Sequence, residues 1–138
     1  VGGYCADVTR TFVVGTPGDE QREIHAIVRE GNERASRAIR VGMRGRDADA
    51  VARGYIEGRG FGDAFGHSLG HGIGIEVHEA PRLAPTAEAS HPDHAVVTIE
   101  PGIYRPGWGG VRIEDDVFLE DGGARVLTAF SHDLIEIG

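Results

Sequence analysis

A single long amphipathic segment near the start of the chain constrains its fold most. Apolar side chains recur at helical spacing from Ile24 to Ile39. The pattern predicts a helix over Glu20–Arg40, which Asp19 can cap at its start. A helix with one apolar face has to bury that face against another layer of structure. The segment therefore requires a partner layer of comparable length.

The rest of the chain supplies a second helix and a series of strands. Asp47 could open a shorter helix that ends at Gly58 or Gly60 and packs beside the first. Runs rich in β-branched and aromatic residues predict strands at 4–14, 95–100, 111–119 and 134–137, with shorter runs near residue 104 and at 125–127. The chain shows no internal repeat and no linker. We therefore expect one α+β domain, with a curved, mainly antiparallel sheet, helices on its outer face and a site on its inner face.

Charge and composition exclude several classes of partner. The 22 acidic residues outnumber the 14 basic ones, and the formal charge of -8 disfavours binding to nucleic acid or to an anionic membrane surface. No apolar run approaches the roughly 20 residues that span a bilayer. The single cysteine, Cys5, rules out an intrachain disulfide and fits a reducing cytoplasm. We predict a cytoplasmic protein without nucleic-acid or membrane partners, and a homodimer as a candidate assembly.

A glycine-rich stretch after residue 61 has the composition of a binding site. Glycines at 62, 66, 70, 72 and 74 alternate with His67, His71 and His78. So many glycines disfavour regular helix, and they let the backbone approach a site closely. Residues 73–78 alternate as a strand would, which would turn His78 toward the pocket at a distance from His71.

The other histidines and the segment that follows the glycines are expected to have no chemistry. Residues 81–94 contain three prolines and predict a surface loop that borders a cleft. Of the remaining histidines, His25 lies on the amphipathic helix. The others, His91, His94 and His132, lie in predicted loops, where exposure to solvent is the ordinary interpretation.

Three predicted strands each place a carboxylate among apolar neighbours. These are Asp7, Glu100 and Glu114. One such carboxylate is ordinarily explained by an ion pair or a capped turn. Three of them beside the glycine-flanked His71 suit Mn²⁺, Co²⁺, Fe²⁺ or Zn²⁺. A metal site is the economical interpretation, and the alternative is a buried polar network without metal, which predicts no loss of stability in a chelator.

Four motifs, in order along the chain, resemble one known family. They read GYCADVTRTFVVG, HSLGHGIGIEVHEAP, TIEPGIY and GVRIEDD. They are similar to the catalytic domain of the creatinase/aminopeptidase family of metallopeptidases, which has the pita-bread fold. The last two motifs resemble its Xaa-Pro dipeptidase and Xaa-Pro aminopeptidase branch. The resemblance covers nearly the whole chain, and it implies that residues 1–138 are the C-terminal part of such a domain, without its upstream half and N-terminal domain.

The same resemblance implies a substrate and a set of metal ligands. The expected reaction is hydrolysis of an N-terminal peptide bond, chiefly Xaa-Pro, with a peptide as partner and two divalent ions as cofactors, Mn²⁺ first and Co²⁺, Zn²⁺ or Fe²⁺ as alternatives. It implies that Asp7 and Glu114 bridge both ions, while His71 and Glu100 bind one of them. Family members carry one more aspartate, upstream of the first residue here. One ion would therefore lose a ligand, and this chain alone need not be active.

Catalytic roles follow from that expectation. A water bridging the two ions would attack the substrate carbonyl. Glu100 would accept the proton of the water and pass it to the leaving nitrogen. His67 and His78 would hydrogen-bond the carbonyl or the developing oxyanion, and Arg112 would orient Glu114 or the substrate. Tyr104 could add a hydroxyl to the pocket or serve only the sheet edge.

Two other functions share the fold. A catalytically silent pita-bread module binds proteins or nucleic acid, and such modules typically lose the acids and the histidine. A creatinase-type enzyme cleaves a C–N bond without metal, and replaced ligands would be its sign. In this sequence Asp7, His71, Glu100 and Glu114 are all present. The sequence therefore favours a metallopeptidase over both alternatives.

Overall fold

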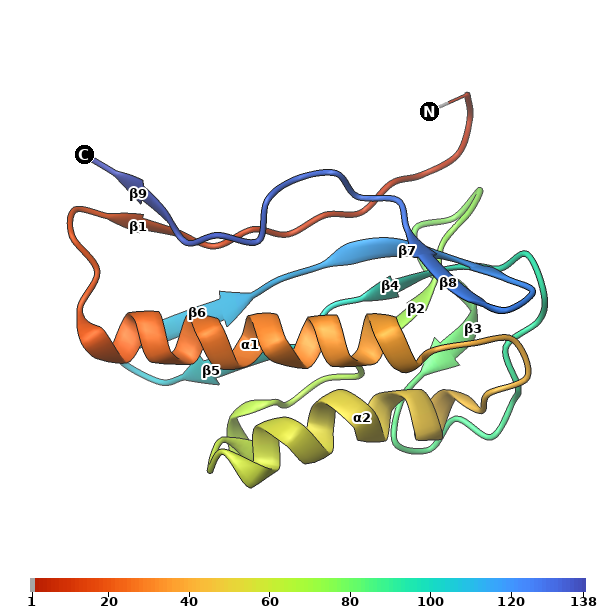
Figure 1. The fold of residues 1–138 in the computed structure, drawn as a ribbon, viewed down its shortest axis with the longest axis horizontal. Coiled ribbons are helices and arrows are strands. Elements are labelled where there is room, and N and C mark those ends of the chain that lie inside the picture. Colours follow the sequence, from red (N-terminus) through yellow and green to blue (C-terminus); the bar gives the residue numbers. More distant parts are fainter. Residues whose placement is uncertain (1) are drawn as a thin grey trace.

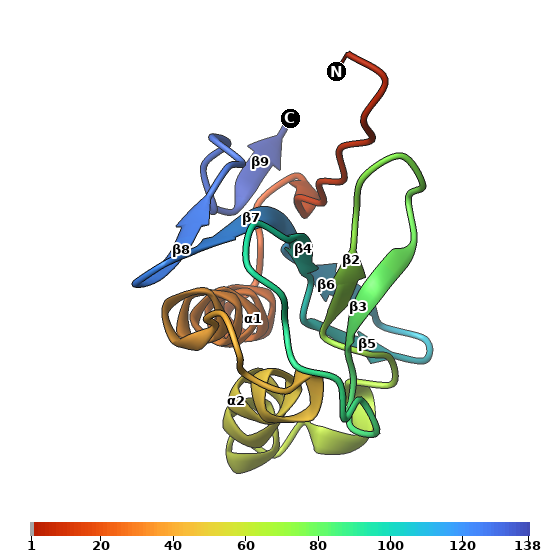
Figure 2. The same ribbon diagram turned by 90° about the vertical axis from the view of Figure 1, so that its right-hand side faces the viewer.

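Two helices pack side by side against one face of a sheet in the computed structural model, which describes residues 2–138 (Figures 1 and 2). Helix α1 spans Asp19–Ala38 and α2 spans Gly45–Gly58. Both helices that the sequence periodicity predicted are confirmed. Their starts differ slightly, because Gly18 and not Asp19 occupies the N-cap of α1 and α2 begins before Asp47. Neither helix combines the length and the apolar character that crossing a membrane would need.

The main sheet has five strands, all antiparallel to their neighbours, in the order β3-β2-β4-β7-β8. Its strands are β2 (Gly70–Gly72), β3 (Glu79–Leu83), β4 (Val96–Ile99), β7 (Asp115–Glu120) and β8 (Gly123–Val126). Two smaller pairs flank it: the antiparallel β5 (Gly102–Arg105) and β6 (Gly109–Arg112), and the parallel β1 (Phe12–Val14) and β9 (Ile135–Ile137). A 3-10 turn, η1 (Gly62–Ala64), follows α2. The predicted α+β, mainly antiparallel architecture is confirmed.

The hydrophobic core lies between the helices and the sheet, and this positions the site on the opposite face. Val97 and Ile99 of β4 are fully buried in the same cluster as Val28 of α1. Because successive side chains of a strand point to opposite faces, Thr98 and Glu100 point away from the helices. The helix layer thus fixes β4 while leaving its polar side chains free to form a site.

The N-terminal segment differs from its prediction. Only Phe12–Val14 form a regular strand, so Asp7 lies in an extended stretch and not inside a strand. Within the described residues this stretch finds scattered partners: the Cys5 amide donates to the Gly74 carbonyl at 2.7 Å, and Thr9 forms an isolated bridge with Glu114. A regular strand needs a neighbouring strand along its length, and local sequence composition does not predict whether one is present.

The segment between β2 and β3 is a turn and not the predicted strand. The Gly74 amide donates to the Glu76 carbonyl at 3.1 Å, which closes the turn. Ile75 is 68% exposed, so its alternation with polar neighbours does not reflect burial. The turn places the centre of the His78 ring 4.2 Å from the centre of the His71 ring. The prediction that the two histidines lie apart is therefore wrong. Strand β3 also occupies the first residues of the predicted loop at 81–94.

Two loop histidines are less exposed than predicted. His91 is 1% exposed, and its backbone is hydrogen-bonded to Met43 at 2.9 Å. Neither nitrogen of its ring has a hydrogen-bond partner within the described residues, and burial lowers the pKa of His91. His132 is half-buried and contacts the buried carboxylate of Asp115 at 2.8 Å. His94 is exposed, as predicted.

Candidate metal centre

Three predicted ligands converge from separate parts of the chain. One ligand atom each from Asp7, His71 and Glu114 lies within 4.8 Å of the others. Asp7 comes from the extended N-terminal stretch, His71 from the middle of β2, and Glu114 from the link between β6 and β7. Two carboxylates and an imidazole at this separation form a donor set suited to a divalent cation.

His71 is held in the tautomer that a metal ligand requires. Its Nδ1 lies 3.0 Å from the Gly72 carbonyl, which places the proton on Nδ1 and leaves a lone pair on Nε2. That Nε2 lies 3.2 Å from Oε1 of Glu100. A lone pair facing a carboxylate oxygen is unfavourable unless a proton or a cation lies near both. The residues present therefore fit a bound cation.

The environment of Glu114 points the same way. Glu114 is 1% exposed, and burial raises its pKa to about 6, with further raising contributions from the charges of Glu100 and Asp7. The hydroxyl of Thr9 donates to Oε2 of Glu114, and Nε of Arg112 lies 3.7 Å from the same oxygen. These two contacts only partly compensate the gathered negative charge, so a cation would stabilise the ionised group.

Glu100 lies beside the three-residue group rather than inside it. Its amide donates to the Leu69 carbonyl at 2.8 Å, which fixes the chain where β4 ends. The hydroxyl of Thr98 donates to Oε1 of Glu100 at 3.0 Å and accepts the His71 amide at 3.1 Å. One threonine thus positions two predicted ligands. Nη1 of Arg112 lies 4.0 Å from the other oxygen of Glu100.

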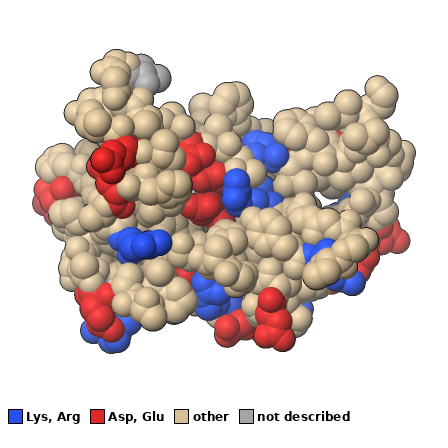
Figure 3. Space-filling view, turned by 180° about the vertical axis from the view of Figure 1, so that it is seen from behind, with Lys and Arg blue, Asp and Glu red and all other residues tan. Residues whose placement is uncertain are grey.

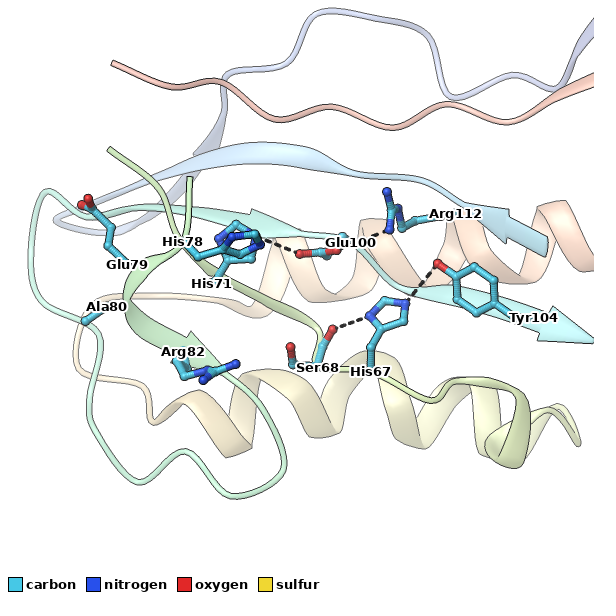
Figure 4. Close-up of a pocket in the computed structure, with 10 residues that line it drawn as sticks. All are labelled: His67, Ser68, His71, His78, Glu79, Ala80, Arg82, Glu100, Tyr104 and Arg112. Atoms are coloured by element: carbon cyan, nitrogen blue, oxygen red, sulfur yellow. Dashed lines mark hydrogen bonds and ion pairs between the residues drawn. The ribbon is translucent and has the colours of Figure 1, made fainter. Parts of the chain in front are cut away.

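An open cleft of about 770 Å³ adjoins this group. Figure 4 shows Glu100 and the neighbouring rings of His71 and His78 in its middle, with Arg82 on β3. Its lining comprises His67, Ser68, His71, His78, Glu79, Ala80, Arg82, Glu100, Tyr104 and Arg112. In the surface view from behind, acidic and basic side chains lie next to each other near the middle of the face (Figure 3). Every residue predicted to take part in catalysis lines this cleft.

His67 has a defined hydrogen-bond arrangement at the cleft wall. Its Nδ1 lies 2.8 Å from the Ser68 carbonyl, so the proton is on that nitrogen. Its Nε2 then accepts from the hydroxyl of Tyr104, 3.1 Å away. Tyr104 therefore contributes its hydroxyl to the pocket, one of the two roles the sequence left open. Burial raises the pKa of Tyr104, so the hydroxyl keeps its proton near neutral pH.

Asp7 also borders a second hollow of about 400 Å³. Its amide donates to Oδ2 of Asp116 at 3.1 Å, and Oδ1 of Asp116 has no hydrogen-bond partner within the described residues. Burial raises the pKa of Asp116. The negative charge around Asp7 therefore extends beyond the predicted ligands.

Sequence reasoning missed several residues that complete the site. Thr9 lies two positions after Asp7, and Thr98 lies two positions before Glu100. Residues two apart on an extended chain share a face, so both threonines could have been found by that spacing. Arg82 lies in a segment predicted as a loop, and no local pattern marked it.

Comparisons with known proteins bear on the same motifs. The model of metallopeptidase family M24 matches residues 1–121. An Xaa-Pro dipeptidase of Pyrococcus furiosus is 48% identical over 132 residues, which cover 96% of this chain and 38% of that protein.

Solved structures give the same picture. The Xaa-Pro dipeptidase of Bacillus anthracis is 50% identical with a TM-score of 0.95, covering 98% of this chain and 38% of that one. The X-Pro aminopeptidase of Thermotoga maritima is 45% identical, with a TM-score of 0.95 and the same coverage of both chains. The expected pita-bread architecture is thus confirmed as that of a partial domain. The chain spans about 38% of the length of these relatives.

Proposed function

Because this chain belongs to metallopeptidase family M24, we propose that the complete protein hydrolyses an N-terminal peptide bond, chiefly an Xaa-Pro bond. The observation that carries the proposal is the convergence of Asp7, His71 and Glu114, in which His71 has the proton on Nδ1 and also lines an open cleft. Relatives named Xaa-Pro dipeptidase add support for the substrate class. The cytoplasmic location and the homodimer stay predictions.

Asp7, His71, Glu100 and Glu114 would hold two divalent ions, with Mn²⁺ as our first candidate. When bound, such ions activate the attacking water and polarise the peptide carbonyl. Glu100 would accept the proton of that water and return it to the leaving nitrogen. The Thr98 hydroxyl holds Oε1 of Glu100 at 3.0 Å, which leaves Oε2 as the oxygen able to turn toward the substrate.

The residues around the cleft would orient the substrate. His78 lies against His71 and can donate to the scissile carbonyl from the side of the turn before β3. His67 accepts from Tyr104 in its present tautomer, so it would need to gain a proton or exchange that partner to stabilise an oxyanion. Arg112 lies near carboxylate oxygens of both Glu100 and Glu114, where it would keep the two groups oriented.

Arg82 offers a means to distinguish the two substrate classes. Its guanidinium lines the cleft and has no carboxylate partner among residues 2–138. A cation without a partner in a substrate cleft would attract a free carboxylate. A dipeptide places its terminal carboxylate close to the scissile bond, whereas a longer peptide does not. The arrangement favours a dipeptide ending in proline.

The test compares two substrates in the complete protein after removal and return of Mn²⁺. We expect metal-dependent cleavage of alanyl-proline and weaker cleavage of a longer peptide with proline second. Arg82→Met should raise KM for the dipeptide by about tenfold, since one hydrogen-bonded charge is lost, and leave the longer peptide unaffected. If neither substrate is cleaved in a metal-dependent reaction, the proposal is overturned and the silent binding module is favoured.

A further inference from the structure

An ion pair on α2 has contacts that an ordinary helix salt bridge lacks. Nε of Arg53 lies 2.6 Å from Oδ2 of Asp49, and Nη2 lies 2.9 Å from Oδ1, so the pair is bidentate. The side chain of Asp49 is 1% exposed and that of Arg53 is 19% exposed. Burying two charges is costly unless their remaining donors and acceptors are also satisfied. The question is what satisfies them here.

The pair is completed by the main chain of residues 65–69. Nη1 of Arg53 donates to the Phe65 carbonyl at 2.9 Å, and Nη2 donates to the His67 carbonyl at 2.7 Å. Oδ1 of Asp49 accepts the Leu69 amide at 3.0 Å. The segment lies between η1 and β2 and belongs to neither helix nor strand. Its other main-chain hydrogen bonds lie at its two ends, from the Phe65 amide to the Gly62 carbonyl and from the Glu100 amide to the Leu69 carbonyl. Two side chains of α2 therefore fix three main-chain atoms within five residues.

The same contacts determine where the ring of His67 lies. The Arg53 guanidinium stacks 4.3 Å from the centre of the Phe65 ring. That ring in turn meets the His67 ring edge-on at 5.1 Å. On its other side the imidazole is held by the Ser68 carbonyl and the Tyr104 hydroxyl. The main-chain hydrogen bonds of Asp49 and Arg53 and the ring contacts through Phe65 therefore both position His67.

We propose that Asp49 and Arg53 are positioning residues that present His67 to the cleft, an inference that rests on the proposed peptidase function. They act through the main chain of 65–69 and do not themselves line the cleft. The fork of an arginine is needed because one group must donate to a carboxylate and to two carbonyls at once, which a lysine ammonium cannot match. The three ligands of the metal group lie outside this segment.

The decisive experiment is a double-mutant cycle between Arg53 and His67 in the complete protein. Arg53→Met should lower kcat about 100-fold, as a misplaced catalytic group does, and Arg53→Lys should recover part of that loss. In a His67→Ala background the same Arg53→Met change should lower kcat less than about twofold, because Arg53 acts on kcat through His67. Equal losses in both backgrounds would refute the proposal.

A spectroscopic measurement separates this inference from the peptidase function. With ¹⁵N-labelled histidine, Arg53→Met should shift the ring signals of His67 and leave those of His71 unchanged, with Mn²⁺ affinity within about twofold of the parent. Unchanged His67 signals would refute the positioning role, even in a protein that cleaves no peptide. If Arg53→Met does not fold, Arg53→Lys is measured in its place. The matched control is Arg34→Met, which removes an exposed pair with Glu30 at the same spacing and should change neither readout.

Discussion

The environments of acidic side chains on the outer surface of α1 and in the group of Asp7, His71 and Glu114 shift their pKa values in opposite directions. On α1, Glu33 accepts a hydrogen bond from Arg29, which lowers its pKa. In the metal group, burial raises the pKa of Glu114 to about 6, and the charges of Glu100 and Asp7 act in the same direction. The helix thus neutralises its own charges within the chain. The metal group brings like charges together, and a bound cation would compensate them.

The largest effect should come from removing the only imidazole of the metal group. His71→Ala in the complete protein should weaken Mn²⁺ binding at least 100-fold, since even the loss of an outer-shell partner costs about 10- to 100-fold. Isothermal titration calorimetry measures the affinity. His94→Ala, at an exposed histidine, is the control and should bind as the parent does. An unchanged affinity in His71→Ala would show that the group is not a metal site.

Removing the metal should destabilise the cleft without changing any residue. At a free metal concentration of 100 times Kd, chelation should lower the free energy of unfolding by about 2.7 kcal/mol. Thermal melts with and without chelator measure this change, and added Mn²⁺ should reverse it. His71→Ala should be insensitive to the chelator. A parent protein with the same melting temperature in both conditions would support the buried polar network instead.

Lowering the pH should weaken metal binding, but in the absence of metal it should stabilise the fold. With metal present, a proton on Glu114 competes with the ion, so affinity should fall by about tenfold per pH unit below pH 6. Without metal, the folded pKa of Glu114 lies above the ordinary 4.5, so its contribution to stability is present below pH 4.5 and is lost as the pH rises through about 6. Calorimetry and chelated melts across this range test both signs.

Glu33 on α1 provides the internal contrast for that titration. Its folded pKa is lowered, so its contribution is present at neutral pH and is lost as the pH falls. Glu114→Gln should abolish the stabilisation at low pH seen without metal, whereas Glu33→Gln should leave it intact. If that stabilisation persists in Glu114→Gln, another group of the cleft is responsible for it.

The smallest effect is expected on the helix surface. Glu30 pairs with Arg34 at 2.7 Å and with Arg37 at 3.6 Å, with all three side chains partly exposed. Glu30→Gln should cost less than about 0.5 kcal/mol in urea unfolding, because exposed pairs are screened by solvent. Its Mn²⁺ affinity should equal that of the parent. A cost above about 1 kcal/mol would contradict the view that α1 charges act only locally.

Periodicity predicted the helices well because the pattern itself reflects burial. Ile24 and Val28 are fully buried on the face of α1 that the sequence assigned to the core. Strands were harder, because a strand depends on a partner distant in sequence. The run around Asp7 has strand-like composition, yet its pairing with Glu114 is confined to one bridge at Thr9. Apolar and polar residues also alternate at 73–78, which predicted a strand. These residues form a turn, because they have no partner strand among residues 2–138.

The candidate site could be predicted as far as its motifs extend. Asp7, His71, Glu100 and Glu114 were placed by four short motifs, and the structure brings them to one region of the sheet. Asp49 and Arg53, which hold the segment 65–69, could not be predicted, because the partners of this pair are main-chain atoms. Asp49 and Arg53 have the i, i+4 spacing of any surface pair, and only the fold places the Leu69 amide against them.

The buried imidazole of His91, which has no hydrogen-bond partner in the part of the chain that the structure describes, has a practical consequence for engineering. A buried polar group without a hydrogen bond is a net cost to the folded state, and an apolar side chain of similar size removes that cost. The ring lies outside the cleft lining, so exchanging it leaves the chemistry of the cleft untouched. Replacing this one interior side chain is therefore a route to a more stable protein that keeps every residue of the cleft lining.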